Sequence, residues 1–517
     1  MATSDQGLAG TTILVVGAGI MGAGIAQVAA QAGHAVKLFD LRDGATAAAR
    51  AQLAVNLQAL AAKGKVDAEQ VERTLSLIEA VGTLSAAADA GLVIEAIVER
   101  LDAKRALFRE LESIVASSCV LATNTSSISV TAIANGLSHP RRVVGMHFFN
   151  PVPLMKLVEV ISGLHTDAAV AAAIFDLCKT WGKVAVHAKS TPGFIVNRVA
   201  RPYYAEALAL LQEQATTPAV LDACLRAAGF RMGPCELMDL IGHDTNFAVT
   251  QSVFEANFFD RRYTPSLLQR ELVEAGWLGR KTGRGFYLYP STAQTAQERP
   301  IDAATPSAEV TVHGQCTIAA QLADAAQAWT ASRGVRIARQ AQGGWTGLSV
   351  GSARLVLTDG RRAGEISAAL SLPDVAVFDR PPRPTLPNAS PLAYAVAEGA
   401  SAAWQAQAPA WLAALGFAPQ RVADTPALLV ARTLAMLINE ACDAVQQGVC
   451  TTQGVDAAMK LGVNYPAGPF EWLAAWGAAD VLRILDALDA GYRGERYRVS
   501  PRLRHGGDIR PDPGLHS

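Results

Sequence analysis

A glycine-rich turn near the start of the chain constrains its fold more tightly than any other feature. Residues 12–17 form a short apolar run rich in β-branched residues, and the turn that follows reads Gly17-Ala18-Gly19-Ile20-Met21-Gly22. A helical pattern comes next, and a second strand-like run, residues 34–40, ends in Asp40. Strand, turn, helix and strand in this order predict a βαβ unit, which requires parallel strands.

This turn is suited to binding a dinucleotide. Gly17 permits the tight bend, Gly19 lets the backbone approach a pyrophosphate, and Gly22 lets the helix pack on the strand. We therefore expect Gly17, Gly19, Ile20, Met21 and Gly22 to bind a cofactor at the N-terminus of the helix. An acid at Asp40 accepts hydrogen bonds from a ribose 2′-hydroxyl and repels a 2′-phosphate, which favours NAD over NADP. Arg42 argues for NADP instead, since a nearby arginine can neutralise a 2′-phosphate. A turn that binds FAD and a turn that binds no ligand are the alternatives.

Strand-like and helical segments continue to alternate up to about residue 190, which predicts an α/β fold with a Rossmann-type, doubly wound parallel sheet. Beyond residue 190 the pattern of helical and strand-like segments changes twice, and we expect four domains. These are an NAD-binding domain (1–190), a helical substrate domain (191–290), a small intervening α/β domain (291–420) and a second helical domain (421–517). The sequence leaves the role of the intervening domain open.

An internal repeat relates the two helical domains. TPGFIVNRVARPYYAEAL (191–208) aligns with TPALLVARTLAMLINEAC (425–442), and MGPCELMDLIG (232–242) aligns with AGPFEWLAAWG (467–477). A duplicated helical domain is the simplest explanation. The repeated polar landmarks are Arg198 with Arg432 and Glu206 with Glu440.

Composition excludes several classes of function. The 45 basic and 46 acidic residues nearly cancel, so no overall field would attract nucleic acid or an anionic membrane. No uncharged apolar run approaches the roughly 18 residues needed to span a bilayer. Seven cysteines without a CxxC pair argue against a disulfide framework or a structural zinc site, and we expect no metal. We expect a cytoplasmic protein.

Candidate catalytic residues follow the predicted strands. His147 ends the strand at the start of GMHFFNPVPLMKLVEV (145–160), and Glu159 follows after a turn that brings it back toward the imidazole. Ser126 follows another strand, and Asn197 opens the first helical domain. Ligands bind beyond the carboxyl ends of strands in open α/β sheets, so these side chains are placed for chemistry. Taken one at a time, His147 would be a structural histidine, Ser126 a helix N-cap and Asn197 a polar helix contact.

This set of residues fits the oxidation of an alcohol. A hydride leaves carbon for the nicotinamide and a proton leaves oxygen, and a neutral histidine is a suitable base near pH 7. A carboxylate beside it fixes the tautomer and stabilises the imidazolium. We therefore predict His147 as the base, Glu159 as its orienting partner, and Ser126 and Asn197 as donors to the substrate oxygen.

Together the motifs resemble the 3-hydroxyacyl-CoA dehydrogenase family. VVGAGIMGAGIAQVAA, VIEAIVER, TNTSSIS, GMHFFNPVPLMKLVEV, STPGFIVNR, MGPCELMDLIG and GRKTGRGFY occur in family order over residues 12–290. The resemblance implies an NAD-dependent enzyme that acts on an acyl-CoA thioester, with the same four catalytic residues. It also implies NAD contacts at Asp40, Glu95, Arg100, Asn150 and Lys281, and CoA contacts at Lys63 and Lys65.

The long architecture is most similar to the 3-hydroxyadipyl-CoA dehydrogenases of bacterial phenylacetate catabolism. This similarity implies oxidation of (3S)-3-hydroxyadipyl-CoA, whose terminal carboxylate needs a cation such as Arg198 or Arg201. The second helical copy, in which Ala431 replaces Asn197, would be structural and would pack in cis, imitating the dimer contact of shorter relatives. The sequence leaves open a homo-oligomer, either dimer or trimer.

Three alternatives stay open at this point. The first is a 3-hydroxybutyryl-CoA dehydrogenase of fatty acid β-oxidation, butyrate or polyhydroxybutyrate metabolism. The second is a crystallin-like protein that binds NAD without turnover. The third is a dehydrogenase of free 3-hydroxy acids.

Overall fold

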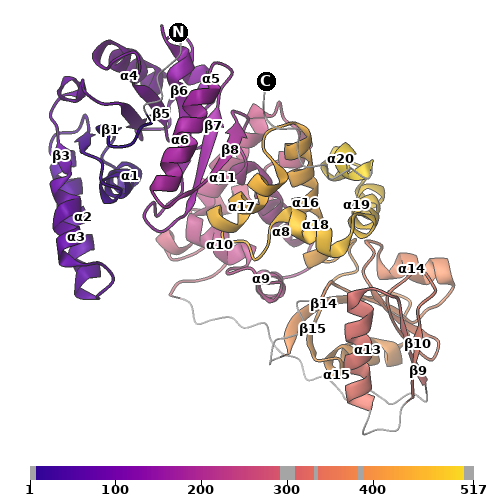
Figure 1. The fold of residues 1–517 in the computed structure, drawn as a ribbon. Coiled ribbons are helices and arrows are strands. Elements are labelled where there is room, and N and C mark those ends of the chain that lie inside the picture. The colour runs from indigo at the N-terminus through magenta and orange to yellow at the C-terminus, as the bar shows by residue number, and fades with distance from the viewer. Residues whose placement is uncertain (1–6, 291–308, 331–335, 382–388, 506–517) are drawn as a thin grey trace. The chain divides into compact units, whose positions relative to one another are not determined.

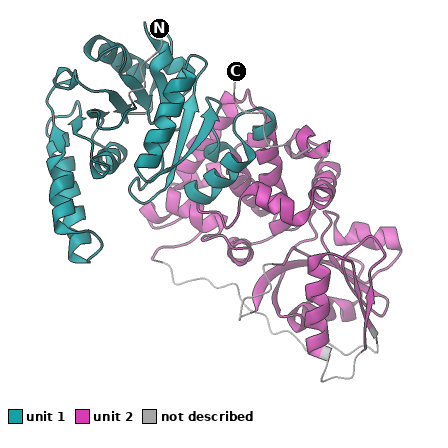
Figure 2. Ribbon diagram, in the orientation of Figure 1, with its two compact units in different colours: residues 1–198, 444–463, 517 teal, residues 199–443, 464–516 magenta. Residues whose placement is uncertain are grey.

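The computed structural model describes residues 7–290, 309–330, 336–381 and 389–505 (Figure 1). Residues 291–308, where the expected intervening domain begins, and 506–517 lie outside the described part. The chain divides into two compact units (Figure 2). Unit 1 comprises residues 1–198 and 444–463, and unit 2 comprises residues 199–443 and 464–516.

Unit 1 is built on an eight-stranded sheet in the order β3-β2-β1-β4-β5-β6-β7-β8. Apart from the antiparallel pair β6–β7, neighbouring strands are parallel, so the predicted doubly wound Rossmann-type sheet is confirmed. The central strands are buried and consist of near-continuous Val, Ile and Leu, as sheets covered on both faces require. The strands are β1 (Ile13–Val16), β2 (Val36–Phe39), β3 (Ile78–Ala80), β4 (Leu92–Glu95), β5 (Val120–Thr123), β6 (Val143–Phe148), β7 (Leu157–Ser162) and β8 (Val184–Lys189).

Helices cover this sheet, and one of them comes from the far end of the chain. The local ones are α1 (Ile20–Gln31), α2 (Ala45–Ala62), α3 (Ala68–Ser76), α4 (Leu101–Ile114), α5 (Val130–Ala134), α6 (Ala168–Thr180) and α7 (Val196–Val199). α17 (Thr452–Gly462), part of the second repeat, packs on β7 and β8. A Cβ added at Gly462 would lie 2.6 Å from Leu157 Cδ2, so a glycine permits this close approach.

The helical part of unit 2 holds both repeats. The first contributes α8 (Arg201–Gln212), α9 (Pro218–Ala227), α10 (Pro234–Ile241), α11 (His243–Ala256), η3 (Arg261–Tyr263), α12 (Leu267–Glu274) and η4 (Arg280–Thr282). The second contributes most of α16 (Val430–Gln446), together with α18 (Pro469–Trp476), α19 (Ala478–Tyr492), η5 (Glu495–Tyr497) and α20 (Pro501–Arg504). Among the described residues, no helix is long and apolar enough to cross a membrane.

A second sheet lies between the repeats, in the order β10-β9-β11-β12-β13-β14-β15. Its last four strands pair parallel, antiparallel and parallel, which is the pattern of β5 to β8 in the first sheet. The strands are β9 (Glu309–His313), β10 (Arg336–Gln340), β11 (Gly347–Val350), β12 (Ala353–Leu357), β13 (Val375–Phe378), β14 (Ser390–Val396) and β15 (Phe417–Arg421). The helices are α13 (Thr317–Thr330), α14 (Ala363–Leu370) and α15 (Ala402–Ala414).

Two buried glutamates join the repeats within unit 2. Glu206 of the first copy accepts hydrogen bonds from Arg432 at 2.8 Å, Arg496 at 2.9 Å and Tyr497 at 3.1 Å. Each glutamate is at most 1% exposed. Arg432 also bonds Glu213.

The contacts of Glu440 mirror those of Glu206. Glu440 of the second copy accepts from Arg262 at 3.1 Å and from Tyr263 at 2.6 Å in the first copy. Arg262 and Tyr263 of η3 thus bind Glu440 as Arg496 and Tyr497 of η5 bind Glu206. The two copies contact each other through a pseudo-symmetric pair of ionic clusters.

We expect Arg432→Leu to lower the free energy of unfolding by about 3–5 kcal/mol, because it leaves Glu206 buried with less compensating charge. Urea denaturation followed by far-ultraviolet circular dichroism measures the loss. As a control, Arg270→Leu removes an exposed pair with Glu274 and should cost about 0.5 kcal/mol or less. Equal losses in the two variants would contradict the importance of the buried cluster.

Candidate active site

An imidazole–carboxylate pair lies at the one antiparallel step of the first sheet. His147 on β6 is directly opposite Glu159 on β7, and the two side chains meet with Nδ1 2.6 Å from Oε2. The second carboxylate oxygen, Oε1, accepts the backbone N–H groups of Ile195 and Val196 at 3.0 Å each. Glu159 is 0% exposed, so its charge is held by three donors rather than by water. The structure therefore brings His147 and Glu159 together.

The pair leaves one ring nitrogen for chemistry. An ionised Glu159 favours hydrogen on Nδ1 and so leaves the lone pair on Nε2. The rings of Phe149 and Phe194 lie 4.5 and 5.9 Å from the imidazole, between centroids, and hold its orientation. A neutral imidazole fixed in this way is able to accept a proton from a hydroxyl group at Nε2.

Ser126 and Asn197 also come together in unit 1. Asn197 Nδ2 donates to the backbone oxygen of Ser126 at 3.3 Å. The loop that carries Ser126 is tied to β6 because Asn124 Oδ1 accepts the N–H of Phe148 at 2.9 Å. The serine hydroxyl lies 3.3 Å from Glu99 Oε1, which is long for a hydroxyl–carboxylate bond. It is therefore free to turn toward another acceptor.

Glu99 is a site residue that our sequence analysis missed. Its Oε1 accepts hydrogen bonds from Thr125 Oγ1 at 2.6 Å and from the N–H groups of Ser126 at 2.9 Å and Ser127 at 3.1 Å. Burial alone would raise the pKa of Glu99, but the Lys104 ammonium and these hydrogen bonds outweigh it and lower the pKa. Glu99 therefore remains an anion that holds the Ser126 loop in shape.

Lys104 is the second residue that was missed, and it is the charged partner of the buried Glu95. Lys104 is 1% exposed and lies 2.6 Å from Glu95 and 3.2 Å from Glu99. The remaining oxygen of Glu95 accepts Thr123 Oγ1 at 2.7 Å. Both oxygens of Glu95 are thus engaged by side chains inside the protein. A lysine at a core-facing position of an amphipathic helix was the available signal.

The other expected contact residues are more scattered. Arg100 pairs with Asp102 at 2.5 Å on the surface, and Asn150 is exposed in the loop after β6. Lys63 and Lys65 are exposed at the end of α2. Lys281 belongs to unit 2, where it pairs with Asp244 at 2.5 Å.

The glycine turn between β1 and α1 has the shape that a pyrophosphate requires. Gly17 has φ +103°, and a Cβ there would lie 2.5 Å from the backbone oxygen of Ala96. A Cβ at Gly22 would lie 1.7 Å from the backbone oxygen of Gly17. A Cβ at Gly19, the N-cap of α1, meets nothing within 4 Å, so open space faces the helix N-terminus there. These residues fit NAD, whose phosphates would lie against this terminus.

Asp40 closes the turn. Its carboxylate accepts the N–H of Ala18 at 2.8 Å and pairs with Arg42 at 3.0 Å. The hydrogen bond from Arg42 lowers the pKa of Asp40 to about 2, so this side chain is ionised at any pH at which an enzyme works. Arg42 is thereby held against Asp40, which reduces its use as a partner for a 2′-phosphate.

The second sheet lacks an imidazole–carboxylate pair among its described residues. The register of β13 and β14 places Phe378 opposite Tyr394, and Asp379, the residue after β13, donates its N–H to the backbone oxygen of Ala393 at 2.9 Å. Asp379 instead accepts the N–H groups of Leu429, Val430 and Ala431 at the start of the second repeat, as Glu159 does for the first. In the part of the chain that the structure describes, no group of three or more potential ligands is arranged to hold a metal ion.

Three family models match the chain. The model described as 3-hydroxyacyl-CoA dehydrogenase, NAD binding domain, matches residues 12–191. The model of the C-terminal domain of 3-hydroxyacyl-CoA dehydrogenase matches twice, at residues 193–289 and 429–509. The model described as 3-hydroxybutyryl-CoA dehydrogenase reduced Rossmann-fold domain matches residues 355–426, within the second sheet.

Two similar proteins match nearly the whole chain, and a third matches about half of it. A 3-hydroxyadipyl-CoA dehydrogenase of Escherichia coli (strain K12) is 43% identical over 95% of this chain and 96% of its own length. A crystal structure of a 3-hydroxybutyryl-CoA dehydrogenase from Escherichia coli K12 has a TM-score of 0.86 and 42% identity, covering 96% of this chain and 98% of its own. A probable 3-hydroxybutyryl-CoA dehydrogenase of Bacillus subtilis (strain 168) is 42% identical over 54% of this chain and 96% of its own length.

The Asp40–Arg42 pair generates a prediction about cofactor choice. We expect Asp40→Ala to weaken NADH binding about 10- to 100-fold, the usual effect of losing a hydrogen bond to a charged group. The same change releases Arg42, so NADPH binding should improve. Fluorescence titration with each cofactor gives the two dissociation constants, and Arg42→Ala serves as the control. Equal weakening of NADH and NADPH would contradict this prediction.

Proposed function

The chain belongs to the 3-hydroxyacyl-CoA dehydrogenase family, and on that premise we propose that it oxidises (3S)-3-hydroxyadipyl-CoA to 3-oxoadipyl-CoA. The family makes it an NAD-dependent oxidoreductase. The adipyl substrate is supported by the relative of that name, which matches across both repeats and the second sheet. The Bacillus subtilis relative named for the butyryl substrate matches 54% of this chain.

The observation that carries the proposed chemistry is the buried contact of 2.6 Å between His147 and Glu159. We propose that Nε2 of His147 takes the proton of the 3-hydroxyl, while Glu159 stays ionised and stabilises the imidazolium. NAD⁺, when bound, accepts the hydride from C3. Because Glu159 is fixed by two backbone N–H groups, the imidazole does not need to reorient during the reaction.

Ser126 and Asn197 are proposed to hold the 3-oxygen. Asn197 Nδ2 is a donor, and the weakly held Ser126 hydroxyl is able to turn from Glu99 toward the substrate. Glu99 and Lys104 would act as positioning residues, since they shape the loop rather than touch the oxygen. Lys63, Lys65, Asn150 and Lys281 remain proposed contacts of CoA or NAD.

A 3-hydroxybutyryl-CoA substrate is the second candidate. It is favoured by the full-length crystal structure from Escherichia coli K12, which bears the name of a 3-hydroxybutyryl-CoA dehydrogenase. The two substrates share the thioester, the 3-hydroxyl and the hydride chemistry, and they differ in the terminal carboxylate. The proposed role in phenylacetate catabolism depends on the adipyl substrate, whereas the butyryl substrate would favour fatty acid β-oxidation.

We also propose that the protein is located in the cytoplasm and that its second helical repeat packs against the first within the chain. All seven cysteines are free thiols, which is typical of the reducing cytoplasm. The helical repeats contact each other within the chain, so any homo-oligomer would use other surfaces.

We expect His147→Ala to reduce kcat by about 10²–10⁴-fold, because the proton acceptor is lost. Following NADH oxidation with acetoacetyl-CoA measures the effect. The control Glu159→Gln keeps a side chain of similar shape and should also reduce kcat, with little effect on the dissociation constant of NADH. A kcat for His147→Ala within tenfold of the wild type would exclude it as the base.

We expect kcat/KM for 3-oxoadipyl-CoA to exceed that for acetoacetyl-CoA by at least about tenfold, since a cation that binds the terminal carboxylate contributes more than about 1.4 kcal/mol. Both thioesters are reduced with NADH under the same conditions. Equal or reversed values would favour the butyryl substrate, and no turnover of either would favour an NAD-binding protein without activity.

A further inference from the structure

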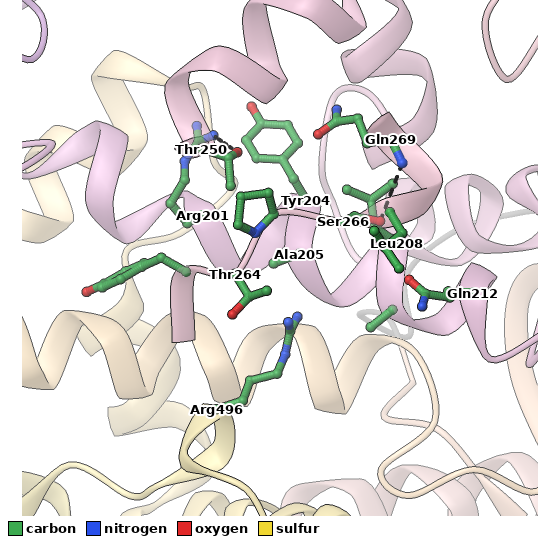
Figure 3. A pocket seen from close by; sticks show the side chains of 14 residues that line it. Arg201, Tyr204, Ala205, Leu208, Gln212, Thr250, Thr264, Ser266, Gln269 and Arg496 are labelled. Carbon is green, nitrogen blue, oxygen red and sulfur yellow. Dashed lines mark hydrogen bonds between the residues drawn. The ribbon is translucent and has the colours of Figure 1, made fainter. Parts of the chain in front are cut away.

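A pocket of about 360 Å³ opens at one edge of the second sheet, within unit 2. Another pocket of unit 2, which follows α8 among the helices (Figure 3), has only about 230 Å³. Sites for small molecules usually hold roughly 300–1,000 Å³, so the pocket of the second sheet has the volume of a ligand site and the α8 pocket falls short of it.

The pocket lies at the carboxyl ends of strands that run in the same direction. β9 and β10 are parallel, β12 and β13 are parallel, and β11 is antiparallel to both β9 and β12. The lining residues 314–316, 341, 344–346, 356–359 and 380 therefore lie where β9, β10, β12 and β13 end, and Asp480 and Arg483 of α19 complete the wall. Open α/β sheets bind their ligands at this edge.

The connection from β9 to α13 is built like the one from β1 to α1. β9, α13 and β10 form a βαβ unit, as β1, α1 and β2 do. Gly314 follows β9 with φ +106°, and Gly17 follows β1 with φ +103°. α13 has 14 residues, and the first N–H groups of a helix have no partner within it. This end of α13 therefore favours a phosphate group.

The charged side chains around the pocket favour an anion independently of the helix. Asp480 is shared by Arg380, at 2.7 Å, and by Arg483, and Asp359 pairs with Arg361 at 2.6 Å. Among these five side chains, the guanidinium groups outnumber the carboxylates by one. Arg380 is 8% exposed, and its Nε is buried without a hydrogen-bond partner in the described part of the chain. A desolvated guanidinium with an unused donor gains from an anionic ligand.

Trp345 gives the pocket a flat aromatic wall. Its indole stacks on the imidazole of His313 with ring centroids 4.1 Å apart and 24° between the ring planes. His313 is buried and lies with Nε2 2.9 Å from the Ser349 hydroxyl, so the stack is anchored in the sheet. Trp345 itself is only partly buried. A ring fixed in this way loses little freedom when a second flat ring stacks on it.

We propose that this pocket binds a nucleoside monophosphate. The phosphate would lie at the N-terminus of α13 and pair with Arg380 and Arg483, and the base would stack on Trp345. Asp359 would accept a hydrogen bond from a ribose hydroxyl, whereas it would repel a bare phosphate ion.

A single nucleotide fits the turn better than a dinucleotide does. Gly314 is followed by Gln315, Cys316, Thr317, Ile318 and Ala319, so the second and third glycines of the first turn have no counterpart here. Those glycines are the ones that admit a pyrophosphate and bring the helix close to the strand.

The test titrates AMP, GMP, CMP and UMP into the full chain by calorimetry, with the matching nucleosides and inorganic phosphate as comparisons. We expect at least one monophosphate to bind about tenfold or more tightly than its nucleoside and than phosphate, because only the nucleotide engages both the arginines and the indole. Trp345→Ala and Arg483→Gln should each weaken its binding about tenfold or more, and Trp345→Phe should restore most of the loss.

Arg362→Gln is the matched control. It removes an exposed arginine of the same domain that pairs with Glu365 outside the pocket, and it should leave nucleotide binding unchanged. Circular dichroism checks that each variant is folded. Arg483 has a side chain that is 58% exposed, so Arg483→Gln carries the test if Trp345→Ala does not fold.

Asp40→Ala separates this pocket from the glycine turn of the first sheet, where AMP resembles half of NAD. A nucleotide in the proposed pocket responds to Trp345→Ala and Arg483→Gln and is indifferent to Asp40→Ala. The reverse pattern would place the nucleotide at the first turn and refute the proposal, as would a wild type that binds none of the four monophosphates. None of these outcomes depends on the acyl substrate, so this proposal and the proposed function stand or fall separately.

Discussion

A single buried carboxylate connects the chemistry of this molecule to its fold. Glu159 is removed from water, and an imidazole and two backbone N–H groups satisfy its oxygens. The same residue therefore orients His147 and caps the start of α7, which carries Asn197. A substitution that disturbs either contact disturbs both, so the orientation of the His147 imidazole and the position of Asn197 depend on one side chain.

The second sheet keeps the strand pairing of the first, but its described residues lack the imidazole–carboxylate pair. Asp379 keeps the capping contacts to the start of the second repeat, while the described residues of this sheet form no imidazole–carboxylate pair. The strand order β12 to β15 retains the parallel, antiparallel and parallel pairing of β5 to β8. The anchoring of a helix N-terminus thus persists where the described residues form no imidazole–carboxylate pair.

Sequence reasoning predicted the first sheet well because βαβ alternation, a glycine turn and β-branched runs are local signals. It also identified the motif that holds His147 and Glu159, because the strand, the turn and the return toward the imidazole lie within one short segment. Glu99 and Lys104 were missed because their contacts depend on how two loops converge, which no local pattern records. The placement of α17 on the first sheet was missed for the same reason, since its partner strands β7 and β8 are distant in sequence.

The fusion of two helical repeats in one chain affects how far the two repeats can differ in sequence and how their pairing responds to dilution of the protein. In an assembly of identical subunits every substitution appears on both sides of the symmetry axis, so a cavity cannot open on one side alone. Here Ala205 and Asn439 occupy equivalent positions and differ freely, while the clusters around Glu206 and Glu440 still match. Because the partners are covalently joined, their pairing has an effective concentration set by the chain rather than by the solution, and it persists at any dilution.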